Sequence, residues 1–292
     1  MYEMSNKQMR WLLLIGLSVV WGSSFILMKQ ALLGLTAIQV GALRMIISAL
    51  FLLIIVPGKL KLIHKRHWKY IFLNAVLGTF FPVFLFAFAV KHIDSGIVAI
   101  LNSLTPLNTL LLGFFFFGLL FRKKQVLGVL IGMLGTVFLI SQSASLHPDD
   151  NYWFSLMVIV ASIGYAFNVN ILKKYLSDLD ATAIAVGNFA LVLIPAFLVL
   201  IGTGFFQQDF LRAPVLPAVG YMSILAVVGT ALAKIFFNRL VQLSSPVFAS
   251  SVTYLIPVIA LIWGFWDHEH IYFSQILAGF VILLGVYLVN NK

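Results

Sequence analysis

This sequence contains no cysteine and few charged residues. Cysteine does not occur, which excludes disulfide bonds, thiolate metal sites and cysteine nucleophiles together. Charged residues make up only 10% of the 292 residues, whereas a soluble domain has about 25%. Hydrophobic residues make up 62%, and the mean hydropathy is +1.05. We therefore expect lipid, rather than water, to be the main solvent of this chain.

Carboxylates are missing from the central part of every apolar run. The nine Asp and Glu residues all lie at the ends of these runs or between them. Proton-coupled pumps commonly place Asp, Glu or His inside the membrane. The sequence therefore favours facilitated diffusion or exchange over proton coupling, although water or a substrate can also carry protons.

The apolar residues form runs of membrane-spanning length. A spanning helix needs about 20 mostly apolar residues to cross roughly 30 Å of hydrocarbon. The runs predict an all-α membrane protein with ten transmembrane helices. The first run continues from Trp11 to Leu33, which is too long for a signal-peptide core. The predicted spans are 11–33, 36–56, 70–90, 95–119, 125–141, 152–172, 183–203, 217–240, 245–266 and 272–290.

Basic residues are concentrated on one predicted side of the membrane. The net charge of +10 reflects topology rather than a nucleic-acid partner, because cytoplasmic loops carry the excess of Lys and Arg. Lys91 and Arg212 fall on the outer side, and Lys29, Arg44 and Lys234 fall within spans. We expect a multi-pass protein of the cell inner (plasma) membrane with both termini cytoplasmic. The other basic residues, all on the cytoplasmic side, are Lys7, Arg10, Lys59, Lys61, Lys65, Arg66, Lys69, Arg122, Lys123, Lys124, Lys173, Lys174, Arg239 and Lys292.

The segment 59–69, KLKLIHKRHWK, mixes basic residues with apolar ones. Such a segment can lie on an anionic cytoplasmic leaflet. The alternative is a solvated loop whose charges only enforce the topology.

The two halves of the sequence share a register. Gly78-Thr79 and Gly229-Thr230 are each followed by a proline 28 positions after the glycine, at Pro106 and Pro257. A weaker match pairs WGSSFILMK at 21–29 with YAFNVNILK at 165–173. Because five is an odd number, a second copy of five helices enters the membrane in the opposite orientation. We therefore predict two inverted five-helix repeats, residues 1–144 and 145–292.

Helix-breaking and polar residues within the spans mark a candidate central pathway. A proline at mid-depth is tolerated where protein or a water-filled cavity surrounds the freed carbonyl. Matched positions in two halves point to a central site. For each polar residue a hydrogen bond between helices, worth about 0.6 kcal/mol, is the alternative. The predicted substrate-pathway residues are Trp21, Ser24, Thr79, Asn102, Pro106, Tyr165, Asn168, Thr230, Lys234, Tyr254 and Pro257.

Cations inside spans are costly and indicate function by default. Lys234 either meets a substrate carboxylate or phosphate, or its ammonium reaches the cytoplasmic interface beside Arg239. Arg44 lies about 12 Å into its span, where packing against a polar helix face and ligand contact are both open. Lys29, near the outer end of the first span, is expected to reach the interface.

Motifs for enzyme chemistry do not occur. We find no Gly-x-Ser-x-Gly elbow, no His-Glu-x-x-His and no Walker loop, so we predict neither an enzyme nor a cofactor. His268-Glu269-His270 does not have the spacing of a known zinc site, and a solvated loop is the better interpretation. Gly128, Gly132 and Gly135 permit close helix approach, either within the chain or in a dimer.

Several sequence features resemble a known family. They are WGSSF at 21–25, Ala-Leu-Arg at 42–44, GTALAKIFF at 229–237, and Gln125, Gly128 and Gly135 after the first mid-span proline. Over about residues 10–290 the chain resembles the EamA branch of the drug/metabolite transporter superfamily. The resemblance implies ten helices in two inverted halves, and export or exchange of amino acids or other small metabolites.

Together these features predict a permease that carries a small-molecule substrate, with membrane lipid around it, as a monomer or weak homodimer. A central cavity would alternate its access as one half rocks on the other, with Gly-Thr turns and proline-broken helices as moving or lining parts. The alternative is a non-transporting membrane assembly factor or receptor. No ring of like charges or filter motif favours a channel.

Overall fold

The computed structural model describes residues 5–93, 95–144, 153–210, 214–266 and 273–290, and within these ranges the chain is helical without strands. In the first half the elements are α1 (Asn6–Ala31), α2 (Ala37–Ile55), the 3-10 helix η1 (Pro57–Leu62), α3 (Lys65–Ala75), the π-helical η2 (Val76–Phe80), α4 (Phe81–His92), α5 (Ser95–Asn102), α6 (Thr105–Phe117) and α7 (Lys123–Ala144). In the second half they are α8 (Trp153–Tyr175), α9 (Ala181–Gly202), η3 (Phe205–Gln207), α10 (Val215–Ala226), the π-helical η4 (Val227–Leu232), α11 (Ala233–Leu243), α12 (Pro246–Ser250), α13 (Val252–Trp266) and α14 (Phe273–Asn290).

The all-α membrane architecture predicted from the sequence is confirmed. Six helices in the described part of the chain are long and apolar enough to cross a membrane: Asn6–Ala31, Ala37–Ile55, Lys65–His92, Trp153–Tyr175, Ala181–Gly202 and Val215–Leu243. The apolar helices Thr105–Phe117, Pro246–Ile259 and Ile276–Val289 are shorter. The count of ten spans and the repeat boundary at residues 144 and 145 stay predictions.

The Gly-Thr pairs do not form turns, as the sequence had led us to expect. Gly78-Thr79 lies in η2 and Gly229-Thr230 in η4, and each π-helical segment continues directly into α-helix on both sides. A π-bulge widens one turn of a helix and occurs frequently at functional sites. The prediction of turns was wrong because a single widened turn keeps the chain helical.

The two mid-span prolines differ in their structural roles. α5 and α6 are separated at Ser103 and Leu104, and Pro106 sits in the first turn of α6, where its missing N–H costs nothing. In the second half the break falls at Ser251, and Pro257 lies inside α13. The freed carbonyls near both breaks are bonded by side chains. For example, Thr105 donates to the carbonyl of Asn102 at 2.7 Å and Thr253 to that of Ser250 at 3.0 Å.

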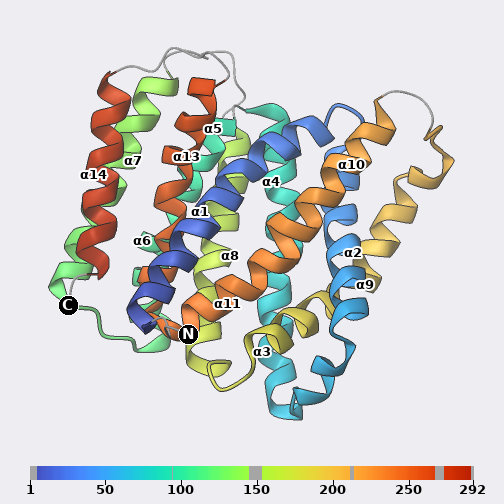
Figure 1. The fold of residues 1–292 in the computed structure, drawn as a ribbon, viewed down its shortest axis with the longest axis horizontal. Coiled ribbons are helices and arrows are strands. Elements are labelled where there is room, and N and C mark those ends of the chain that lie inside the picture. The colour runs from blue at the N-terminus through green and yellow to red at the C-terminus, as the bar shows by residue number, and fades with distance from the viewer. Residues whose placement is uncertain (1–4, 94, 145–152, 211–213, 267–272, 291–292) are drawn as a thin grey trace.

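The two halves are interleaved rather than set side by side (Figure 1). α7 packs along α14 at one edge of the bundle, and α2 packs along α9 at the other. Between them, α1 crosses the middle against α13, α10 and α11. α1 begins and α14 ends at the same end of the bundle, where α3 also begins.

Ion pairs join the halves at that end of the bundle. Arg66 contacts Asp178 at 2.6 Å, His67 contacts the same carboxylate at 3.3 Å, and Lys59 contacts Asp180 at 3.3 Å. We call these five residues the ion-pair cluster. Lys59, Arg66 and His67 of the segment 59–69 thus contact acids of the α8–α9 connection rather than being only solvated.

Candidate functional site

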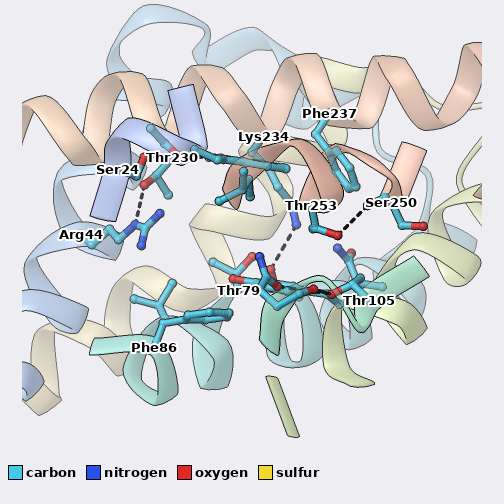
Figure 2. Close-up of a pocket in the computed structure, with 18 of the residues that line it drawn as sticks. Ser24, Arg44, Thr79, Phe86, Thr105, Thr230, Lys234, Phe237, Ser250 and Thr253 are labelled. Carbon is cyan, nitrogen blue, oxygen red and sulfur yellow. Dashed lines mark hydrogen bonds between the residues drawn. The ribbon is translucent and has the colours of Figure 1, made fainter. Parts of the chain in front are cut away.

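A cavity of about 120 Å³ lies inside the bundle. A single water needs only roughly 10–15 Å³, so the space is large enough for a small molecule. Its walls come from α1, α2, η2, α4, α5, α6, α8, α9, η4, α11, α12 and α13, and no residue whose side chain the structure describes in α7 or α14 lines it. Figure 2 shows the lining side chains pointing into this space from opposite walls.

Most of the lining residues occur in pairs at matched positions of the two halves. Residues from η2 to α6 pair with residues 151 positions later, as Gly78 does with Gly229, and α1 pairs with α8 at 144 positions, as Trp21 does with Tyr165. The lining pairs are Trp21 and Tyr165, Ser24 and Asn168, Phe25 and Val169, Gly78 and Gly229, Thr79 and Thr230, Val83 and Lys234, Phe86 and Phe237, Asn102 and Thr253, and Thr105 and Ile256. The cavity is thus formed by the same positions used twice.

The irregular backbone segments supply much of the polar wall. Both π-helical segments and both helix breaks border the cavity. Trp21 Nε1 donates to the carbonyl of Gly229 at 3.0 Å, and the hydroxyl of Thr230 donates to the carbonyl of Leu225 at 3.0 Å. Inside a membrane, non-helical hydrogen bonding is tolerated only where such partners or a cavity satisfy the backbone. The irregular helix segments therefore supply polar groups to the cavity, and the cavity and its side chains satisfy the hydrogen bonding of these segments.

Aromatic rings form two related pairs on the cavity walls. Trp21 lies against Phe237 with ring centroids 5.2 Å apart, and Tyr165 stacks on Phe86 at 5.7 Å. The two contacts are equivalent, because Trp21 matches Tyr165 and Phe237 matches Phe86 in the two halves. Phe25 also meets Phe86, at 6.4 Å. These rings give a bound molecule apolar surface on both sides.

Two cations enter the cavity. Arg44 of α2 donates from Nε to the hydroxyl of Thr230 at 2.6 Å, and Lys234 of α11 donates from Nζ to the carbonyl of Gly78 at 3.4 Å (Figure 2). Lys234 is buried, with 8% of its surface exposed. The alternative that Lys234 extends to the interface therefore does not describe its side chain.

Two buried polar atoms of the lining residues have no hydrogen-bond partner within the described ranges. They are Thr79 Oγ1 and Asn168 Oδ1. Buried polar groups are nearly always hydrogen-bonded, so these two atoms in the cavity wall are available to a water molecule or a ligand. No three His, Cys, Asp or Glu side chains gather as a metal site among the described residues.

The structure brings together eight of the predicted pathway residues and leaves three outside the cavity. Those that line it are Trp21, Ser24, Thr79, Asn102, Tyr165, Asn168, Thr230 and Lys234. Tyr254 instead points toward α7, where its hydroxyl donates to the carbonyl of Val129 at 3.0 Å. Pro106 and Pro257 are buried in helix packing and do not line the cavity.

Other lining residues were not selected from the sequence. For Arg44 the sequence leaves both packing and ligand contact open, and the residue lies in the cavity wall. Phe25, Phe86 and Phe237 lie in the wall among many similar phenylalanines, and the 144- and 151-residue spacings would have identified them. His268-Glu269-His270 lies outside the described residues.

These features define a multi-pass membrane protein with a central cavity between two related sets of helices. The chain belongs to the EamA-like transporter family, whose model matches residues 9–141 and 152–291, and thereby to the drug/metabolite transporter superfamily. It is a membrane transporter of this type with a small-molecule substrate, and the family and its relatives' names indicate a transporter rather than an enzyme.

Individual relatives extend over most of the chain. An uncharacterized transporter of Archaeoglobus fulgidus is 25% identical over 97% of this chain and 99% of its own length. The uncharacterized inner membrane transporter YedA of Escherichia coli is 25% identical over 86% of this chain and 80% of that protein. Protein PecM of Dickeya dadantii is 27% identical over 84% and 80%, respectively. A crystal structure superimposes with a TM-score of 0.74 at 16% identity, over 96% of this chain and 95% of that one, which shows the shared fold.

Proposed function

We propose that this transporter carries small metabolites, amino acids or related compounds, through its central cavity by alternating access. The observation that carries the proposal is the cavity itself, walled by matched residues of both halves. A substrate carboxylate has Arg44 and Lys234 as cationic partners, and an ammonium or hydroxyl group has Thr79 Oγ1 and Asn168 Oδ1 as acceptors.

The proposed cycle opens the cavity first to one side of the membrane and then to the other. Since the lining positions are related by pairs, a rearrangement that opens one end has a counterpart that opens the other. The π-helical segments η2 and η4 and the breaks at Ser103-Leu104 and Ser251 are the flexible points of this motion. Facilitated diffusion or exchange fits the absence of acids among the described lining residues.

For the cellular setting we propose the inner (plasma) membrane, with both termini in the cytoplasm. The name of the inner membrane relative YedA supports the location. α1 begins and α14 ends at the end of the bundle that carries the ion-pair cluster, and the excess of Lys and Arg in the sequence supports a cytoplasmic location of that end. We propose a monomer or weak homodimer without a nucleic-acid partner.

Flux measurements on purified protein in liposomes test this proposal. A panel of labelled amino acids, nucleosides, sugars and cationic drugs is offered with and without unlabelled compound inside the vesicles. We expect saturable uptake of amino acids, faster when the same compound is trapped inside if the protein is an exchanger. Vesicles that take up no compound faster than empty liposomes would favour the alternative, a membrane assembly factor or receptor.

A further inference from the structure

The charges in the cavity break the pairing of its walls. Lys234 lines the wall at the position matched by Val83. α2 and α9 begin 144 positions apart, at Ala37 and Ala181, so Arg44 of α2 is matched by Asn188 of α9. Asn188 does not line the cavity and donates to Asn74 instead. Each cation therefore has a neutral counterpart in the other half, so each half supplies one positive charge that the pseudo-symmetry does not require.

Neither cation has an acidic partner. The ion pairs of Lys59, Arg66 and His67 lie in the ion-pair cluster at the end of the bundle, and no acid among the described residues lines the cavity. Arg44 and Lys234 bond only to a hydroxyl and a carbonyl oxygen. Burying a charge without an opposite charge costs several kcal/mol, so a negatively charged group bound beside these two side chains would be strongly stabilised.

We propose that the cavity binds a small organic anion with two acidic groups, carboxylate or phosphate, one at Arg44 and one at Lys234. This inference rests on the proposed transport function and narrows its substrate class. In Figure 2 the Arg44 guanidinium enters from the α2 side, while the Lys234 ammonium points toward Thr79, so they offer two separate anion positions.

The geometry of each cation suits its acidic group. With Nε of Arg44 donating to Thr230, the two terminal nitrogens of the guanidinium are left to donate to two oxygens of a carboxylate or phosphate. The Lys234 ammonium has three donors, of which the carbonyl of Gly78 takes one, at the long distance of 3.4 Å. A second acidic group completes this site better than the neutral carbonyl does.

The remaining walls define the body of the ligand. The stacked rings of Phe86 and Tyr165 offer an apolar surface to the carbon atoms of a ligand. Asn168 Oδ1 can accept a hydrogen bond from an ammonium or hydroxyl group of the ligand. A dicarboxylic amino acid satisfies all of these groups. A zwitterion with one carboxylate leaves one of the two cations unpaired, and it brings no net charge to offset them.

The test compares isosteric ligands on purified protein in lipid nanodiscs. The probes are glutamate against glutamine and succinate against succinamate, which differ mainly in one negative charge, with 2-phosphoglycolate, which has one phosphate and one carboxylate, as the phosphate arm. By calorimetry or thermal shift, we expect glutamate and succinate each to bind about tenfold or more tightly than the matching amide, as a charged hydrogen bond is worth about 1.5–3 kcal/mol. Tighter binding of 2-phosphoglycolate than of succinate assigns phosphate as the preferred second acidic group.

Variants locate the two positions. Lys234→Met and Arg44→Gln should each remove most of the preference for the acid over the amide, and Lys234→Arg should retain it. The control Lys29→Met removes a cation that is exposed and outside the cavity, and should leave the preference unchanged.

Equal affinity of wild-type protein for each acid and its amide would overturn the inference, without recourse to any variant. In that case, continued flux of neutral amino acids would leave the proposed transport function standing. If liposomes show no flux of any compound, the transport function itself fails.

Discussion

Glycine residues let α7 and α14 meet backbone to backbone. A Cβ atom at Gly285 would lie 2.5 Å from the amide nitrogen of Gly132 and 2.7 Å from the carbonyl oxygen of Gly128. Gly285→Ala should therefore push the two helices apart and lower the thermal unfolding midpoint in detergent. The control is Gly16→Ala, where the added methyl meets nothing within 4 Å and better helix propensity should give an equal or higher midpoint. An unchanged midpoint for Gly285→Ala would contradict this close packing.

Some residues of the cavity wall could be predicted from their type and their depth in the membrane. Others could not, because the rotation of a helix about its axis determines which of its residues face the cavity. Thr79 and Thr230 could be chosen because the matched Gly-Thr pairs mark them in the sequence. Tyr254 was chosen beside Pro257, yet it lies between the lining residues Thr253 and Ile256 and points away from them. In helices that are apolar on every side, the sequence does not indicate which face turns inward.

Within the ion-pair cluster, the α8–α9 connection is held by charge. Partial burial raises the pKa of Asp178, but hydrogen bonds and the charges of His67 and Arg66 outweigh it and lower this pKa below its ordinary 3.8. Partial burial also raises the pKa of Asp180, and there the Ala183 amide and Lys59 outweigh it and lower the pKa. A carboxyl whose pKa is lowered by folding stabilises the fold above its ordinary pKa. That stability is lost as the pH falls through the lower value of the folded state.

Asp178→Asn should therefore lower the thermal midpoint at neutral pH and flatten its fall below about pH 3.8. The change should be small, below about 1 kcal/mol, because 51% of the Asp178 side chain is exposed and surface ion pairs are weak. Asp178→Glu keeps the charge and serves as the control. If the midpoints of wild type and Asp178→Asn fall in parallel with acid, Asp178 does not contribute in this way.

Helices as elements followed closely from the sequence, whereas their irregularities did not. The predicted run 36–56 is α2, Ala37–Ile55, and 183–203 is α9, Ala181–Gly202, because apolar length and polar flanks set both ends. The π-helical segments were missed since one widened turn leaves the apolar pattern intact. The break at Ser251 was missed because Pro257 drew attention to a site where the helix continues.

At the scale of the whole molecule, interleaving limits how the halves move. α2 is packed along α9 and α1 along α13, so two halves that rock must slide along long helix contacts rather than part as separate bodies. The contact between Arg66 of α3 and Asp178 bridges the predicted halves through exposed side chains at one end of the bundle. If that end opens during transport, these two residues must separate.

A cross-link between positions 66 and 178 tests whether these residues must separate during transport. Because the sequence contains no cysteine, a thiol reagent will react only with the introduced cysteines. In Arg66→Cys with Asp178→Cys, a short bifunctional thiol reagent should abolish flux while leaving ligand binding, because the cavity stays intact but its access is fixed. Lys61→Cys with Lys65→Cys places both thiols in the first half, so the same reagent should leave flux unchanged. Full flux through the Arg66–Asp178 cross-linked protein would mean that this end does not open, and access would have to alternate by another route. Loss of flux restored by cleaving the linker would tie the motion of the two halves to transport itself.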